Sequence, residues 1–333
     1  MKRVHRKWSA LVWLMILALV VGGTVGCSKA KDSGKLKIAL LVPGSITDGG
    51  WSQSAYDGLK KVESEFGAET SYMQVKSPSD VVEGFRDYAQ KGYKIVFGHS
   101  YDYQDAAKQV APGFKNTIFI TSGGTTVMDN VSPIYTEFEQ ATYLMGVVAA
   151  KMTKTGVVGA IGSQEMPAIS KTIISFTQGV KDTNPNVKVL TTYIGTQDDV
   201  GKAKEATIAM INQKADIFWV SANAAGQGTL QAVQENASKG VKIFGSYSRW
   251  SKNAPDVVIA DGVINFSNAF SVVVKQVKDG TWKPGTIRVG TKDNVVQFLW
   301  NDKMTIPQEA KDAYDKALKD VQDGKIKIDI GAY

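Results

Sequence analysis

Short apolar runs alternate along this chain with stretches whose apolar residues recur every three to four positions. The apolar run at residues 35–42 predicts a buried strand, and the spacing of Trp51, Ala55 and Leu59 predicts a helix over residues 52–65. This alternation continues to residue 121 and resumes in a second series from residue 140. Strands joined by crossover helices form parallel, doubly wound sheets, so the pattern predicts an α/β protein with two such lobes. Further strands are expected at 70–75, 94–97, 117–121, 156–161, 188–194, 216–221, 242–247 and 257–265, and further helices at 79–91, 103–110, 140–151, 169–183, 200–213, 226–239 and 267–279. The tail is expected to end in strands and a helix near 307–323.

The first 26 residues have the pattern of a secretory signal peptide. A basic start that includes Arg3 and Lys7 precedes an uncharged apolar run over residues 8–26. Glycines interrupt the end of this run, and Cys27 follows at once, which argues against a permanent membrane span. Cys27 is the only cysteine. We expect it to carry the lipid that anchors the mature protein on the extracytoplasmic face of the cell membrane, with residues 27–34 as a flexible leash.

Composition excludes several classes of protein. The formal charge is +7, but four of the cations lie in the predicted leader, so nucleic-acid binding is not indicated. A single cysteine excludes intramolecular disulfides. Of the two histidines, only His99 lies outside the leader, so no zinc site is expected. We expect neither a metal nor a cofactor.

The carboxyl ends of the predicted strands are the expected place for a ligand, because open α/β sheets bind ligands there. Aromatic residues are frequent at these positions, and flat rings can hold a flat ligand while polar side chains bond its edge. For any one of these aromatic residues, packing in the core is as good an interpretation as contact with a ligand. Trp51 is the exception, because it opens a helix beside two glycines. We therefore expect ligand contacts from Asp48, Trp51, Ser52, Gln53, His99, Ser100, Ser122, Met166, Ser221, Asn223, Tyr247, Asn265 and Phe266.

No catalytic constellation is evident in the sequence. Gly226 and Gly228 follow a strand, but without a third glycine they indicate a tight turn more than a phosphate loop. Glu137 and Glu139 are spaced for acid and base work, but no nucleophile or histidine accompanies them. A structural role at the junction of the lobes is favoured for this pair. We expect a receptor and not an enzyme.

Several segments of the chain carry motifs that occur together in one protein family. Residues 48–59, Asp-Gly-Gly-Trp-Ser-Gln-Ser-Ala-Tyr-Asp-Gly-Leu, are similar to the family's Asp-x-x-Phe-Asn-Gln-Ser-Ala-x-x-Gly-Leu. Glu139 with residues 143–146, Tyr-Leu-Met-Gly, is similar to a second motif, and Gln178-Gly179-Val180 lies in a third. The segment at residues 24–27 resembles a lipobox, with Thr24 in place of the usual leucine. Together these motifs resemble the basic membrane protein family of substrate-binding lipoproteins from ABC transporters, and the resemblance covers the chain from residue 35 to about 323.

The resemblance implies a type I periplasmic-binding-protein fold, in which three strands cross a hinge between the lobes. It implies lobe 1 at residues 35–138 plus 267–285 and lobe 2 at residues 139–266 plus 286–333. It also implies a small-molecule ligand, a permease and an ATPase as partners, and a monomer. By this resemblance Trp51 replaces a base-stacking phenylalanine, while Asp48 and Ser52 take polar positions.

The resemblance further implies a purine-like ligand, but two expected ribose-binding residues are missing. Tyr247 occupies the place of an aspartate that holds ribose hydroxyls, and a lysine expected near Asn265 is absent. We therefore expect a nucleobase or a nucleoside, with Trp51 and Phe266 stacked on its ring and Asp48, Asn223 and Asn265 at its edge. A riboflavin-like heterocycle, a sugar, and a membrane-tethered sensor without transport are the alternatives.

Overall fold

The computed structural model describes residues 34–47 and 51–331. The compact body begins at Leu36. The predicted leader, Cys27 and Asp48 lie outside the described residues. Within the described ranges, no helix is both long and apolar enough to cross a membrane.

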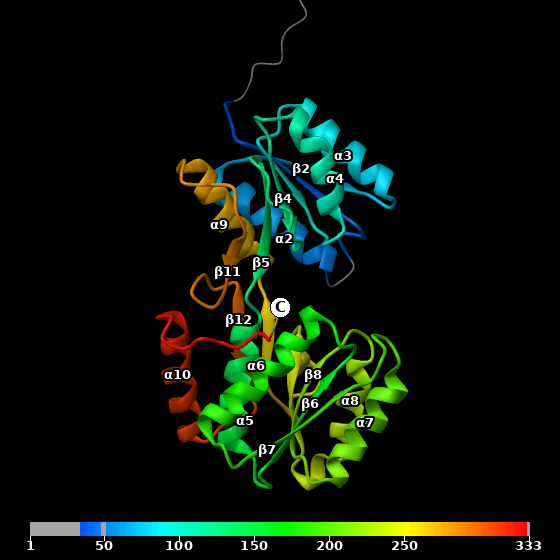
Figure 1. Ribbon diagram of the computed structural model, residues 1–333, viewed down its shortest axis with the longest axis vertical. Coiled ribbons are helices and arrows are strands. Elements are labelled where there is room, and N and C mark those ends of the chain that lie inside the picture. The colour runs from blue at the N-terminus through cyan, green and yellow to red at the C-terminus, as the bar shows by residue number, and fades with distance from the viewer. Residues whose placement is uncertain (1–33, 48–50, 332–333) are drawn as a thin grey trace, which may run out of the picture. The chain divides into compact units, whose positions relative to one another are not determined.

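The body contains two six-stranded sheets with the same order of strands (Figure 1). In the first sheet this order is β11-β5-β4-β3-β1-β2, and in the second it is β12-β10-β9-β8-β6-β7. We call the first sheet with its helices lobe 1 and the second with its helices lobe 2. The elements of lobe 1 are β1 (Lys37–Val42), α2 (Trp51–Phe66), β2 (Glu69–Gln74), α3 (Pro78–Gln90), β3 (Ile95–Gly98), α4 (Tyr103–Val110), β4 (Ile118–Ser122), β5 (Val131–Thr136), α9 (Phe266–Lys278) and β11 (Ile287–Val289).

Lobe 2 repeats this arrangement with its own helices on both faces of the sheet. Its elements are α5 (Glu139–Met152), β6 (Val157–Gly162), α6 (Pro167–Thr183), β7 (Lys188–Tyr193), α7 (Val200–Asn212), β8 (Ile217–Ser221), α8 (Gly226–Glu235), β9 (Lys242–Tyr247), β10 (Val258–Ile264), β12 (Val296–Trp300) and α10 (Gln308–Gln322). The chain passes between the lobes after β5, after β10 and after β11.

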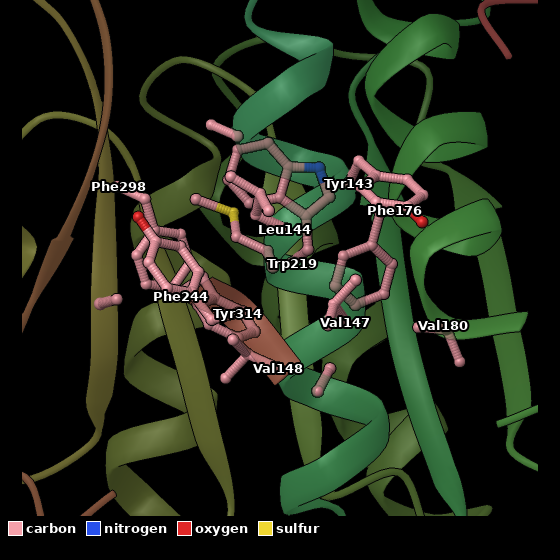
Figure 2. Close-up of a cluster of buried hydrophobic side chains, with 14 of the residues drawn as sticks. Tyr143, Leu144, Val147, Val148, Phe176, Val180, Trp219, Phe244, Phe298 and Tyr314 are labelled. Carbon is pink, nitrogen blue, oxygen red and sulfur yellow. The ribbon is translucent and has the colours of Figure 1, made fainter. Parts of the chain in front are cut away.

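Strand β1 shows why the central strands are apolar on both sides. Ile38 and Leu40 pack into the core under α2 and α9, whereas Ala39 and Leu41 pack into the core under α3 and α4. Successive side chains of a strand point to opposite faces, so a sheet covered on both faces needs an uninterrupted apolar strand. Lobe 2 has the same two-sided core. Figure 2 shows its larger side, where Trp219 lies among side chains of α5 and α6.

The fold differs from the sequence prediction in three places. Strand β5 was not predicted, because Pro133 interrupts its apolar run and proline cannot donate to a neighbouring strand. The structure accommodates Pro133 because β11 pairs with β5 only from Ile134 onward. The other two differences concern β12, which is antiparallel to β10, and β11, which pairs with β5 and so extends lobe 1 beyond the predicted limit at 285.

Raising the pH above about 10 should lower the free energy of unfolding, because burial raises the pKa values of several tyrosines. It raises the pKa of Tyr103 in lobe 1 and of Tyr314 in lobe 2 to about 12. Each neutral ring therefore contributes stability that is complete below pH 10 and is lost as the pH rises through 12. Absorbance at 295 nm and far-UV circular dichroism should change together. Tyrosinate absorbance that rises fully near pH 10, with the circular dichroism unchanged, would contradict this.

Candidate functional site

The exposed ring of Trp51 lies at the carboxyl edge of the first sheet, where α2 begins. Its indole is stacked on the imidazole of His99, with the ring centroids 4.2 Å apart and the planes 26° apart. The indole N–H donates to the carbonyl oxygen of His99 at 2.9 Å. Trp51 is still 45% exposed. One face of the indole thus packs against His99, while the Trp51 side chain remains accessible to solvent. This is the geometry of a platform on which a flat ligand can stack.

His99 supports this platform from below. It is fully buried, with Nδ1 at 2.7 Å from Ser122 Oγ and Nε2 at 3.1 Å from the carbonyl oxygen of Trp51. Phe266 is 5% exposed and meets the Trp51 ring edge-on at 4.9 Å. His99, Ser122 and Phe266 were predicted as ligand contacts. In the structure they lie beneath or beside Trp51, where they fix its orientation.

The remaining predicted residues of lobe 1 differ in their accessibility. Ser52 is buried, and its Oγ accepts a hydrogen bond from the backbone N–H of Gly44 at 3.1 Å, which shapes the turn before α2. Gln53 and Ser100 are half-buried. Asn265 caps α9, because its side-chain oxygen accepts from the N–H of Asn268 at 3.1 Å. This bond uses the carbonyl oxygen of the Asn265 side chain and not its amide nitrogen.

Tyr247 is the corresponding aromatic residue at the carboxyl edge of the second sheet. Its ring is stacked on Phe138, with the centroids 4.5 Å apart, and its hydroxyl lies 3.0 Å from Ser221 Oγ. The residue is 37% exposed, while burial raises the pKa of its hydroxyl. Its backbone has a φ of 60°, a left-handed conformation that is uncommon outside glycine. Phe138 was not among the predicted site residues. Its position, where the chain crosses between the lobes, could have indicated that this aromatic residue lies near the site.

Two other predicted residues of lobe 2 lie at the same edge. Asn223 is exposed in the turn between β8 and α8. Met166 precedes α6 and is 39% exposed. The structure therefore divides the predicted residues into two groups, each at the carboxyl edge of its own sheet. Trp51 and Tyr247 are the accessible rings of these groups.

The crossings between the lobes contain a cluster of charges, the crossover cluster, formed by Tyr135, Glu137, Glu139, Lys171 and Arg288. The Lys171 ammonium and the Arg288 guanidinium both contact the Tyr135 ring, at 4.2 and 4.4 Å from its centroid. Its hydroxyl donates to Glu139 at 3.0 Å and accepts from Lys171 at 2.8 Å. Arg288 pairs with Glu137 at 2.8 Å.

Glu137 and Glu139 both form ion pairs within the crossover cluster. Glu139 is 4% exposed and pairs with Lys171 at 3.4 Å. Tyr135 and Arg288 belong to lobe 1, whereas Lys171 belongs to lobe 2, so the cluster links the lobes. In the described part of the chain, no group of three or more His, Cys, Asp or Glu side chains is arranged to hold a metal ion.

Comparisons with known proteins give consistent results. A family model described as "ABC transporter substrate-binding protein PnrA-like" matches residues 35–329. A purine-binding protein of Brucella abortus is 29% identical over 94% of this chain and 88% of its own. An ABC transporter nucleoside-binding protein of Lactococcus lactis is 28% identical over 96% of each chain. An ABC transporter solute-binding protein of Conexibacter woesei has a similar structure, with a TM-score of 0.72 at 22% identity over 88% of this chain and 98% of its own. The predicted fold and family resemblance are confirmed.

Proposed function

Because the chain belongs to the family of PnrA-like substrate-binding proteins of ABC transporters, we propose that it captures a purine-like ligand, a nucleobase or a nucleoside. The family is a class of binding proteins and not of enzymes. Because its members belong to ABC transporters, the partners of this chain are a permease and an ATPase. The proposal includes anchoring through a lipid on Cys27, at the extracytoplasmic face of the cell membrane. Two relatives whose names refer to purine and nucleoside binding support this choice of ligand.

The Trp51 platform carries the proposal. A purine has a flat aromatic face, and stacking it on a fixed indole costs little side-chain entropy, because His99 and Phe266 already hold the ring. Tyr247 offers a second accessible ring from lobe 2. Phe266 is too buried in the structure to stack on a ligand, so the proposal assigns the stacking contacts to Trp51 and Tyr247. Asp48, Asn223 and Asn265 remain the proposed polar contacts.

Replacing Trp51 with alanine should weaken purine binding by about 5- to 150-fold, since loss of one stacking ring costs ~1–3 kcal/mol. Titration calorimetry with adenine, hypoxanthine, guanine and their nucleosides measures the change. Tyr72→Ala is the matched control, because Tyr72 is also an exposed aromatic of lobe 1 but lies on strand β2. A Trp51→Ala protein that binds purines as tightly as the parent would refute the assignment of the platform.

The ligand class can be tested without a variant. Mass spectrometry of small molecules that co-purify with the protein should find a purine. In a thermal-shift panel, purines should raise the melting temperature, because a ligand that binds only the folded state stabilises it. A panel in which sugars or riboflavin raise the melting temperature and purines do not would overturn the proposal.

A further inference from the structure

A half-exposed arginine lies just beyond the carboxyl end of β9, the strand that ends at Tyr247. Arg249 follows Tyr247 by two residues, and its side chain is 39% exposed. Its Nε donates to Oδ2 of Asp261 at 3.1 Å. Asp261 lies on β10 and is fully buried. A surface arginine is thus held from one side by a carboxylate inside the lobe.

The surroundings of Asp261 fix the position of this arginine. Oδ1 of Asp261 accepts from the backbone N–H of Ser251 at 3.1 Å, and Oδ2 also accepts from the Ser251 hydroxyl. A buried carboxylate must be paired and hydrogen-bonded, and among the described residues the donors to Asp261 are Arg249 and Ser251. Gly245 allows this arrangement, since a Cβ there would lie 2.1 Å from Oδ1 of Asp261. The turn from Tyr247 to Ser251 is therefore tied to the strand behind it.

The guanidinium retains donors for a ligand. Arginine has five N–H donors in one plane, and in the described part of the chain Arg249 donates a hydrogen bond through Nε alone. The terminal amino groups form a fork that matches two acceptors lying in one plane. A 6-oxopurine has such a pair in N7 and O6, whereas adenine has a donor at position 6.

We propose that Arg249 selects 6-oxopurines, such as hypoxanthine and guanine, over adenine, and that Asp261 positions it. This inference rests on the proposed function and narrows the class of ligand. Lobe 1 offers the Trp51 ring to the face of the base, and Arg249 of lobe 2 bonds its N7 and O6 edge. Arg249 is then a specificity-determining residue, and Asp261 acts through it.

The test compares the affinities for hypoxanthine, guanine and adenine in the parent and in Arg249→Met, which keeps an apolar stem and removes the donors. The affinity for the two 6-oxopurines should fall by about 5- to 150-fold, while the affinity for adenine stays the same or rises. Asp261→Asn should also lower the ratio of hypoxanthine affinity to adenine affinity. A loss of stability alone would not change this ratio. Arg86→Met, at an exposed arginine of α3 paired with Glu83, is the matched control.

The outcomes separate this inference from the proposed function. A parent that binds purines, together with an Arg249→Met protein whose ratio of hypoxanthine to adenine affinity is unchanged, overturns the role of Arg249 and leaves the purine receptor in place. Equal losses for adenine and hypoxanthine do the same. A parent that binds none of the purines removes the proposed function and this inference with it.

Discussion

Replacing Gly146 or Gly179 with alanine should lower the free energy of unfolding by about 3 kcal/mol or more, at the upper end of the cost of overpacking. These glycines lie on α5 and α6, where the two helix backbones are nearly in contact. A Cβ on Gly146 would lie 2.1 Å from the carbonyl oxygen of Phe176, and a Cβ on Gly179 would lie 2.1 Å from that of Tyr143. Backbone atoms cannot turn away as a flexible side chain can, so the helices must separate.

Urea denaturation measures this effect, and Gly113→Ala is its control. A Cβ on Gly113 would meet no atom within 4 Å, so that change should alter stability by less than about 1 kcal/mol. The variant with both substitutions should lose less than the sum of the single losses, because one separation of the helices relieves both clashes. A Gly146→Ala protein with the unfolding midpoint of the parent would show that the helices are not this close.

Replacing Glu139 with glutamine should lower the free energy of unfolding by about 3 kcal/mol. The amide can still accept from Tyr135, but the Lys171 ammonium, whose side chain is only 15% exposed, loses its carboxylate partner. Removing one partner of a buried ion pair leaves an uncompensated charge, which costs more than the pair contributes. The double variant Glu139→Gln with Lys171→Met should therefore recover much of the loss.

A double-mutant cycle in urea denaturation measures this coupling. Glu83→Gln is the control, because Glu83 pairs with Arg86 on the exposed surface of α3 and should contribute less than about 1 kcal/mol. If the double variant is as unstable as the sum of the two single variants, Glu139 and Lys171 are not coupled.

The elements of the fold could be predicted wherever apolar periodicity and burial agree. The spacing of Trp51, Ala55 and Leu59 predicted a helix that the structure gives as Trp51–Phe66. Strand β5 was missed because Pro133 opposes its assignment locally, and only the short length of β11 makes the proline acceptable. The return of the chain to lobe 1 at β11 depends on the pairing of Ile287 with Ile134. These residues are more than 150 positions apart in the sequence, so no local pattern predicts their pairing.

The location of the candidate site could be predicted, but which of its residues are accessible and which are buried beneath them could not. Parallel strands bring their carboxyl ends to one edge, so Trp51, His99 and Tyr247 could each be placed there from sequence. That His99 lies buried under Trp51 could not be predicted, because the contacts of His99 with Ser122 and Phe266 form only in the tertiary structure. Arg249 and Asp261 are on different elements, and their pairing depends on tertiary structure. The motif glycines at 146 and 179 were recognised from the resemblance, and the structure supplies their physical reason.

The interleaving of the two sheets constrains the order in which the protein can be completed during synthesis. Lobe 1 needs β11 to cover the outer edge of β5, and β11 is made only after β6 to β10 of lobe 2. Lobe 2 in turn needs β12, which follows β11. A nascent chain that ends before Ile287 therefore has an open edge on β5 and another on β10. Unpaired edges of this kind add strands from other chains, so incomplete chains of this protein are at risk of association until β12 has been made, which ends at Trp300.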